Sequence, residues 1–146
     1  VPSILNPAPV RDPESVMRLL PYVSVLTPNA VEAEQLTGRK VISQEDALEA
    51  ATTLRQAGAD SVIVTRGASG CVIVGPNERS IIHAPVVQAV DSTGAGDAFN
   101  GALAVGLAEK MELRQAAEFA SRVAAVTVTR AGAVESLPQR QDVPGM

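Results

Sequence analysis

Short runs of β-branched residues alternate along this chain with segments of helical periodicity, and this alternation constrains the fold more than any other feature. The runs that predict buried strands cover residues 3–5, 23–26, 61–64, 71–74, 80–82 and 86–90. The segments that predict helices cover residues 13–20, 29–38, 43–58, 95–109 and 113–128. Strands that alternate with helices of this length indicate βαβ units. The expected fold is therefore α/β, with a mainly parallel, Rossmann-type sheet flanked by helices and one antiparallel hairpin at residues 71–82.

Composition limits the classes of function. The 146 residues contain 12 basic and 16 acidic side chains, a formal net charge of −4, and only 2% are aromatic. Such a chain has neither the basic surface nor the stacking residues that nucleic acids require, which argues against a nucleic-acid partner. Cys71 is the only cysteine, so disulfide frameworks and cysteine zinc clusters are excluded. His83, the only histidine, is expected at a strand end.

The length predicts one compact domain covering residues 1–146. No uncharged run reaches the ~18 residues of a membrane-spanning helix. The first residues also lack the pattern of a signal peptide, so a cytoplasmic protein without membrane contact is expected. The chain begins with Val1 instead of Met, which indicates processing or a longer parent protein. The last residues, 139–146, are expected to be frayed.

The densest chemical signal is the segment 91–101, which reads DSTGAGDAFNG and leads into a helical pattern. Gly94 and Gly96 allow close approach to the backbone, and the N–H groups that open a helix carry partial positive charge, which suits a phosphate. Asp97 would lie in the first turn. A carboxylate beside a phosphate suggests a separate task, such as accepting a proton from a hydroxyl, although it could simply stabilise the helix start. A dinucleotide fingerprint is disfavoured because Phe99 replaces its third glycine, and no lysine follows to form a P-loop.

Two further loops follow predicted strands. Asn29 and Glu32 are three residues apart at a helix start, so their side chains can point to the same site. The alternative is a capping asparagine with a solvated glutamate. The segment 65–70, TRGASG, resembles both a phosphate loop and an ordinary hairpin turn. Open α/β sheets bind ligands at the carboxyl ends of their strands, so these loops together predict a nucleotide-binding crevice.

The segment DSTGAGDAFNGAL at 91–103 resembles the C-terminal signature of the ribokinase-like, or PfkB-type, carbohydrate kinases. The resemblance continues in order along the chain, with LNPAP at 5–9, TPNAVEAEQLTG at 27–38, TRGASG at 65–70 and VTVTRAGAVESLP at 126–138. Within the family, the segments LNPAP at 5–9 and VTVTRAGAVESLP at 126–138 are most similar to the ribokinase branch. The resemblance implies a ribokinase-like fold and transfer of the ATP γ-phosphoryl group to a sugar hydroxyl, with ribose as the acceptor and ribose 5-phosphate as the product.

The resemblance also implies roles for individual residues. Asp97 would be the catalytic base, and the amides of Gly94, Ala95 and Gly96 would form an anion hole. Asn29 and Glu32 match an element associated with Mg²⁺ and phosphate. Asp91, like Asp97, would lie on the substrate side. The remaining residues expected to bind the nucleotide are Thr65, Gly67, Ala68, Ser69, Gly70, Gly96 and Ser121. Ser121 stands where some ribokinases have a histidine.

A monovalent cation site, for K⁺, is implied as well. The residues at the matching positions are Asp91, Thr93, Thr127, Arg130, Gly132 and Ser136. Arg130 would contribute its carbonyl oxygen, because a guanidinium cannot ligate a cation.

Members of the family are longer than this chain, and the part without a counterpart here carries their sugar-binding segment and lid. The chain is thus expected to be the C-terminal, catalytic portion of such a kinase and a poor kinase by itself. Two alternatives stay open. One is a truncated, non-catalytic module that binds a nucleotide or a cation; the other is a PfkB-type kinase for fructose, a nucleoside or a vitamin precursor. A homo-oligomeric state of the complete protein is also left open.

Overall fold

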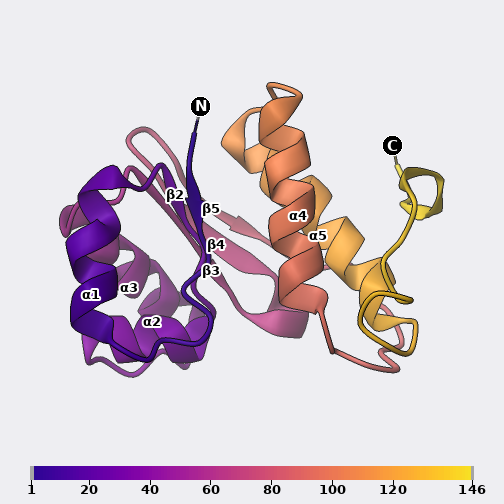
Figure 1. Ribbon diagram of the computed structural model, residues 1–146, viewed down its shortest axis with the longest axis horizontal. Coiled ribbons are helices and arrows are strands. Elements are labelled where there is room, and N and C mark those ends of the chain that lie inside the picture. The colour runs from indigo at the N-terminus through magenta and orange to yellow at the C-terminus, as the bar shows by residue number, and fades with distance from the viewer. Residues whose placement is uncertain (1, 146) are drawn as a thin grey trace. The chain divides into compact units, whose positions relative to one another are not determined.

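The computed structural model describes residues 2–145 (Figure 1). They form two compact units, one ending at Ile81 and the other beginning at Ile82. The first unit contains nearly all of a five-stranded sheet and three helices, and the second contains two long helices and the C-terminal segment.

The sheet has the strand order β1-β2-β3-β4-β5. Its strands are β1 (Ile4–Leu5), β2 (Val25–Leu26), β3 (Ser61–Thr65), β4 (Cys71–Val74) and β5 (Arg79–Ile82). The first three strands are parallel, with Ile4 opposite Val25 and Val25 opposite Ser61. β4 runs antiparallel to β3, with Val62 opposite Val74. The prediction of an α/β fold with a largely parallel sheet is confirmed.

Three helices cover one face of this sheet (Figure 1). They are α1 (Pro13–Leu19), α2 (Ala30–Thr37) and α3 (Gln44–Gln56). Each begins with a side-chain cap. Asp12 accepts hydrogen bonds at the start of α1, a residue that the sequence analysis did not single out, and reciprocal capping boxes join Asn29 with Glu32 and Ser43 with Asp46. These interactions are local in sequence, which is why helix positions can be predicted from short segments.

The core of the first unit lies between the sheet and the helices. Val62 and Val64 of β3 alternate toward it, and so do Val72 and Val74 of β4. The helices contribute mainly alanine and leucine, for which Ala47, Leu48, Ala51 and Leu54 of α3 are examples. Small side chains let α3 pack closely on the sheet, which compensates for the scarcity of aromatic residues.

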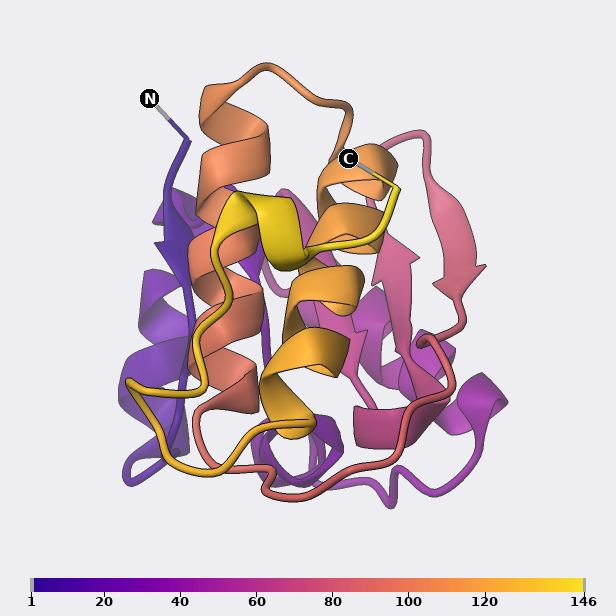
Figure 2. The same cartoon turned by 90° about the vertical axis from the view of Figure 1, so that its right-hand side faces the viewer.

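The second unit is built on α4 (Ala95–Ala108) and α5 (Leu113–Val128), which pack side by side (Figures 1 and 2). Gly106 allows their closest approach, because a Cβ at this position would lie 2.9 Å from the Cβ of Ala116. Phe99 and Leu103 from α4 and Phe119 from α5 are buried. Both helices match their predicted ranges closely.

The strand expected at residues 86–90 does not form. The segment is exposed, with Val86 fully accessible. At its end the Val90 N–H donates to the Val128 carbonyl at 2.7 Å, and so does the N–H of the next residue, Asp91, at 3.1 Å. β-branched residues favour a strand only where a neighbouring strand completes the hydrogen bonds, and no described strand pairs with this segment.

The expectation of a frayed C-terminus is wrong for residues 139–145, while Met146 lies outside the described residues. A short 3₁₀ turn, η3 (Arg140–Asp142), folds back on the second unit (Figure 2). Arg140 pairs with Glu109, Asp142 pairs with Arg130, and Val143 is only 4% exposed. The partners are distant in sequence, so no local pattern indicated this docking. Among the described residues, no helix is long and apolar enough to cross a membrane.

Candidate functional site

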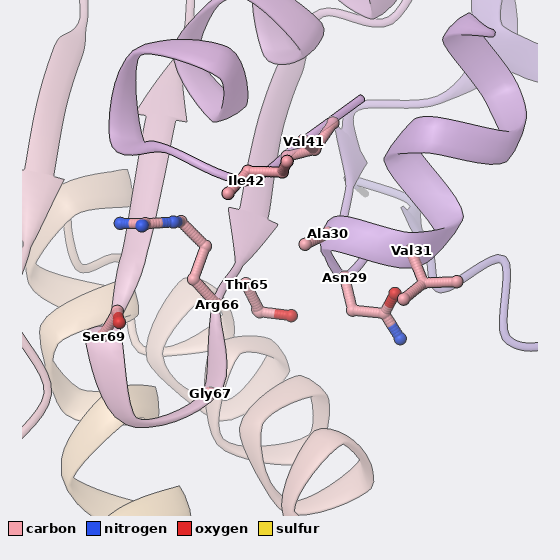
Figure 3. A pocket seen from close by; sticks show the side chains of 9 residues that line it. All are labelled: Asn29, Ala30, Val31, Val41, Ile42, Thr65, Arg66, Gly67 and Ser69. Carbon is pink, nitrogen blue, oxygen red and sulfur yellow. The ribbon is translucent and has the colours of Figure 1, made fainter. Parts of the chain in front are cut away.

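Two of the three loops singled out in the sequence lie together at the carboxyl ends of β2 and β3. Asn29 and Thr65 form an isolated parallel bridge, and the Thr65 N–H donates to the Pro28 carbonyl at 2.9 Å. The Thr65 side chain points toward Asn29, whereas the Asn29 amide extends away from Thr65 (Figure 3). This arrangement follows from parallel pairing, which brings successive strand ends to the same edge of the sheet.

A pocket of about 290 Å³ opens between these loops (Figure 3). Its lining residues are Asn29, Ala30, Val31, Val41, Ile42, Thr65, Arg66, Gly67 and Ser69. Of the residues predicted to bind a nucleotide, Asn29, Thr65, Gly67 and Ser69 line the pocket. Ala68 and Gly70 belong to the same loop without lining it, and Glu32 lies behind it.

Asn29 and Glu32 form the capping box of α2. The Asn29 side-chain oxygen accepts from the Glu32 N–H at 2.8 Å, and a Glu32 carboxylate oxygen accepts from the Asn29 N–H at 2.9 Å. The two residues thus lie together, as predicted. Asn29 also caps the helix, as the alternative had it, but Glu32 is buried and not solvated. The Asn29 amide nitrogen makes no hydrogen bond within the described residues, so it can donate to a ligand.

Asn29 and Glu32 could hold Mg²⁺ only together with a bound phosphate ligand. Glu32 is 7% exposed and supplies one carboxylate, and no group of three or more acidic, histidine or cysteine side chains in residues 2–145 could hold a metal. Mg²⁺ is commonly held by one or two carboxylates together with water and substrate phosphates. Asn29 and Glu32 fit such a shared site and not a dedicated metal cage.

The loop 65–70 is a tight turn between antiparallel strands, η2 (Gly67–Ser69), and is closed by the Arg66 N–H donating to the Gly70 carbonyl at 2.7 Å. Gly67 and Gly70 have φ values of 54° and 88°, which favour glycine. Arg66 was missed by the sequence analysis although it lies within the motif. Arg66 lines the pocket, and its guanidinium makes no hydrogen bond or ion pair within residues 2–145, so the residue adds an uncompensated positive charge to this loop.

The third loop lies in the second unit, at the start of α4. Gly94 precedes the helix with φ 77° and ψ 0°, and no side chain caps the helix. The Ala95 N–H donates to the Ser92 carbonyl at 3.2 Å, whereas the N–H groups of Gly94 and Gly96 have no partner among the described residues. Two of the three amides expected in the anion hole are therefore available to a ligand.

Asp97 lies in the first turn of α4 and is exposed. Its carboxylate makes no hydrogen bond or ion pair within residues 2–145. An acidic side chain in the first turn also stabilises the partial positive charge of the helix start, so the structural interpretation stays beside the catalytic one.

Asp91 ties the loop that precedes α4 to the loop that follows α5. One carboxylate oxygen accepts from the Thr93 N–H at 2.9 Å, and the other accepts from the Gly132 N–H at 3.1 Å. Hydrogen bonds from Thr93, chiefly from its hydroxyl, and then from the Gly132 N–H lower the pKa of Asp91. The carboxylate is consequently ionised at neutral pH.

The other residues expected at the cation site make local contacts at the end of α5 and in the loop that follows it. Thr127 is fully buried, and its carbonyl accepts from the Arg130 N–H at 3.1 Å. The buried Ser136 hydroxyl donates to the Ala133 carbonyl at 2.8 Å. The Arg130 guanidinium pairs with Asp142 at 3.1 Å. A carboxylate with several carbonyl oxygens is a donor set that suits a hard cation.

Ser121 lies on α5 and is 6% exposed.

These features match a known family. The model for "pfkB family carbohydrate kinase" matches residues 1–140. The chain belongs to the PfkB family of carbohydrate kinases. Its relatives include the ribokinase of Haemophilus influenzae, 38% identical over 95% of this chain and 45% of that protein, and the ribokinase of Mus musculus, 39% identical over 99% of this chain and 46% of that protein.

The PfkB fold is shared with solved structures. A ribokinase of Thermotoga maritima superimposes with a TM-score of 0.85 and 36% identity, covering 96% of this chain and 46% of that one. A ribokinase of Arabidopsis thaliana complexed with ribose and ATP superimposes with a TM-score of 0.86 and 30% identity. The match covers 98% of this chain and 46% of that one. The chain spans somewhat less than half the length of these PfkB relatives.

Proposed function

We propose that this chain carries the nucleotide-binding and catalytic part of an ATP-dependent sugar kinase whose acceptor is ribose. The observation that carries the proposal is the turn at the start of α4, where two unpaired N–H groups, of Gly94 and Gly96, lie beside the unpaired carboxylate of Asp97. Phosphoryl transfer needs both, because negative charge must be stabilised on the phosphoryl oxygens while the attacking hydroxyl loses its proton.

In the proposed reaction, Asp97 accepts the proton of the sugar hydroxyl as that oxygen forms a bond to the γ-phosphorus of ATP. The bond between the γ-phosphorus and the β–γ bridging oxygen breaks, and ADP leaves. The N–H groups of Gly94 and Gly96 donate hydrogen bonds to the oxygens of the transferring group. The side chain that removes the proton and the amides that stabilise the charge belong to one turn, which fixes their relative positions.

The pocket of the first unit is proposed to bind the phosphates of ATP. Its Thr65 and Ser69 hydroxyls, Asn29 amide and Arg66 guanidinium are all able to donate hydrogen bonds. No acidic side chain lines it, so the pocket favours an anion. Mg²⁺, held by the phosphates with help from Asn29 and Glu32, would neutralise charge on the β- and γ-phosphates.

K⁺ is proposed to bind at the loops joined by Asp91, where it would be held by the Asp91 carboxylate and by carbonyl oxygens of residues such as Arg130 and Gly132. The ionised Asp91 and the buried hydroxyl of Ser136 support this assignment. These residues fix the loop that precedes Gly94, so they orient the anion hole without contacting the substrate.

Ribose is favoured over other acceptors because the relatives named above are ribokinases. A relative named probable fructokinase-2 from Arabidopsis thaliana is 33% identical, which keeps fructose as the second candidate. The other alternative is a nucleotide-binding module without activity of its own.

The test measures ADP release by the full product of the gene that encodes this chain, with ribose, fructose or a nucleoside as acceptor. We expect ribose to stimulate ADP release, more strongly in K⁺ than in Na⁺, and we expect the isolated 146-residue chain to show little turnover. Stronger stimulation by fructose or a nucleoside would overturn the assignment of ribose. ATP binding with no stimulation by any acceptor would instead identify a non-catalytic module.

A further inference from the structure

Two separate ion pairs anchor the C-terminal segment to the second unit. Arg140 binds Glu109, the residue that ends α4, through two hydrogen bonds of 2.5 and 2.9 Å. Asp142 binds the Arg130 guanidinium at 3.1 Å and also accepts from the Gln139 N–H at 3.0 Å. The first anchor reaches only the far end of α4, whereas the second reaches the loop 130–136 next to the proposed cation site.

The second anchor restrains Arg130 from outside the loop. The Arg130 backbone N–H donates to the Thr127 carbonyl, so one side of the residue is tied to the end of α5. Its guanidinium is tied to Asp142 on the other side. The residues that follow form no regular helix or strand, and Gly132 has φ 94°. A loop of this kind depends on such external contacts for its position.

From Arg130 the contacts continue to the start of α4. Gly132 donates its N–H to Asp91, and Asp91 accepts in turn from the Thr93 N–H. A Cβ at Gly94 would lie 3.6 Å from the Cα and the carbonyl oxygen of Ala133, so the two loops also touch directly. The residues along this path, in order, are Asp142, Arg130, Gly132, Asp91, Thr93 and Gly94.

The ion pair contributes little to global stability. The Arg130 and Asp142 side chains are 38% and 30% exposed, and ion pairs this accessible to water stabilise a fold only weakly. Its effect should therefore appear in where the loop lies and not in whether the protein folds. An effect on the position of the loop without an effect on folding would distinguish a positioning role from a structural one.

We propose that Asp142 is a positioning residue for phosphoryl transfer. Through Arg130 it holds the loop 130–136 against Asp91 and so fixes the direction of the Gly94 and Gly96 N–H groups. The inference rests on the proposed function, in which these N–H groups form the anion hole. The path of contacts itself does not depend on the reaction.

The kinetic test compares Asp142→Asn, Asp142→Glu and Glu109→Gln in the full gene product. We expect Asp142→Asn to lower kcat about tenfold and to raise the K⁺ concentration for half-activation, with little change in KM for ATP. Asp142→Glu, which can still pair with Arg130, should keep most of the wild-type activity. Glu109→Gln removes the other anchor of the same segment and should leave kcat and K⁺ activation nearly unchanged.

Amide hydrogen exchange supplies a readout that needs no activity. In the same proteins, Asp142→Asn should accelerate exchange at Thr93 and Ala95, whose N–H groups are hydrogen-bonded, whereas Glu109→Gln should do so only near residues 139–142. Equal effects of the two variants, unchanged exchange at Thr93 and Ala95, or an Asp142→Asn protein that fails to fold would overturn the inference. If the wild-type protein phosphorylates no acceptor, the proposed function fails and the exchange result alone decides whether Asp142 positions this turn.

Discussion

At the scale of single residues, Gly94 carries the strictest backbone requirement of the proposed catalytic turn. Its φ of 77° is costly for any residue with a Cβ, by about 1–2 kcal/mol. The nearest atoms to an added Cβ belong to Ala133 at 3.6 Å, an ordinary contact, so the cost comes from the backbone and not from a clash. A substitution here would therefore strain or rotate the amides that face the phosphate.

Gly94→Ala is accordingly expected to reduce the free energy of unfolding by about 1 kcal/mol and to lower the rate of phosphoryl transfer. Gly101→Ala in the middle of α4 is the matched control, because an added Cβ there meets no atom within 4 Å. That control should stabilise the protein by about 0.5–1 kcal/mol. Urea unfolding and a kinase assay measure both effects. A Gly94→Ala protein as stable and active as wild type would show that the turn does not need this conformation.

At the scale of an element, the capping box of α3 makes stability depend on pH. Hydrogen bonds from the Ser43 N–H and hydroxyl, and then from the Ile42 N–H, lower the pKa of Asp46. A carboxyl group whose pKa is lowered by folding stabilises the folded state above its unfolded pKa of about 3.9. This contribution disappears as the pH falls through the lower, folded pKa.

Asp46→Asn should thus reduce stability at pH 7 and have a smaller effect at pH 3, which lies below the unfolded pKa. Glu45→Gln removes the same charge from the same turn without breaking the capping box, so it should change stability less at pH 7. Urea titrations of the three proteins at both pH values give the comparison. An Asp46→Asn effect of equal size at pH 3 and pH 7 would refute the role assigned to the carboxylate.

Elements fixed by neighbouring residues could be predicted from the sequence, and those fixed by distant partners could not. The capped helices and the loops of Asn29 and Thr65 at strand ends follow from local patterns. The prediction of a strand at 86–90 was wrong because a strand needs a neighbouring strand to complete its hydrogen bonds. The docked C-terminal segment was missed because its partners Glu109 and Arg130 lie far from it in sequence. The contact between Asp91 and Gly132 spans 41 residues. Only the family resemblance pointed to it.

At the scale of the whole molecule, the proposed chemistry is divided between the two units. The pocket that suits phosphates lies in the first unit, and the turn with Asp97 and the unpaired amides lies in the second. The chain covers less than half of its ribokinase relatives, so the full gene product is the protein in which both parts are to be tested together.

Transfer of labelled γ-phosphate from ATP to ribose by the full gene product, compared between wild type and Asp97→Asn, tests the central claim most directly. General-base assistance is typically worth 10²–10⁴-fold, so the variant should lose about that much rate. Its affinity for ATP, measured in parallel, should change little, because Asp97 does not hold the nucleotide. A variant that binds ATP normally and keeps more than about a tenth of the wild-type rate would contradict the assignment of Asp97 as the base.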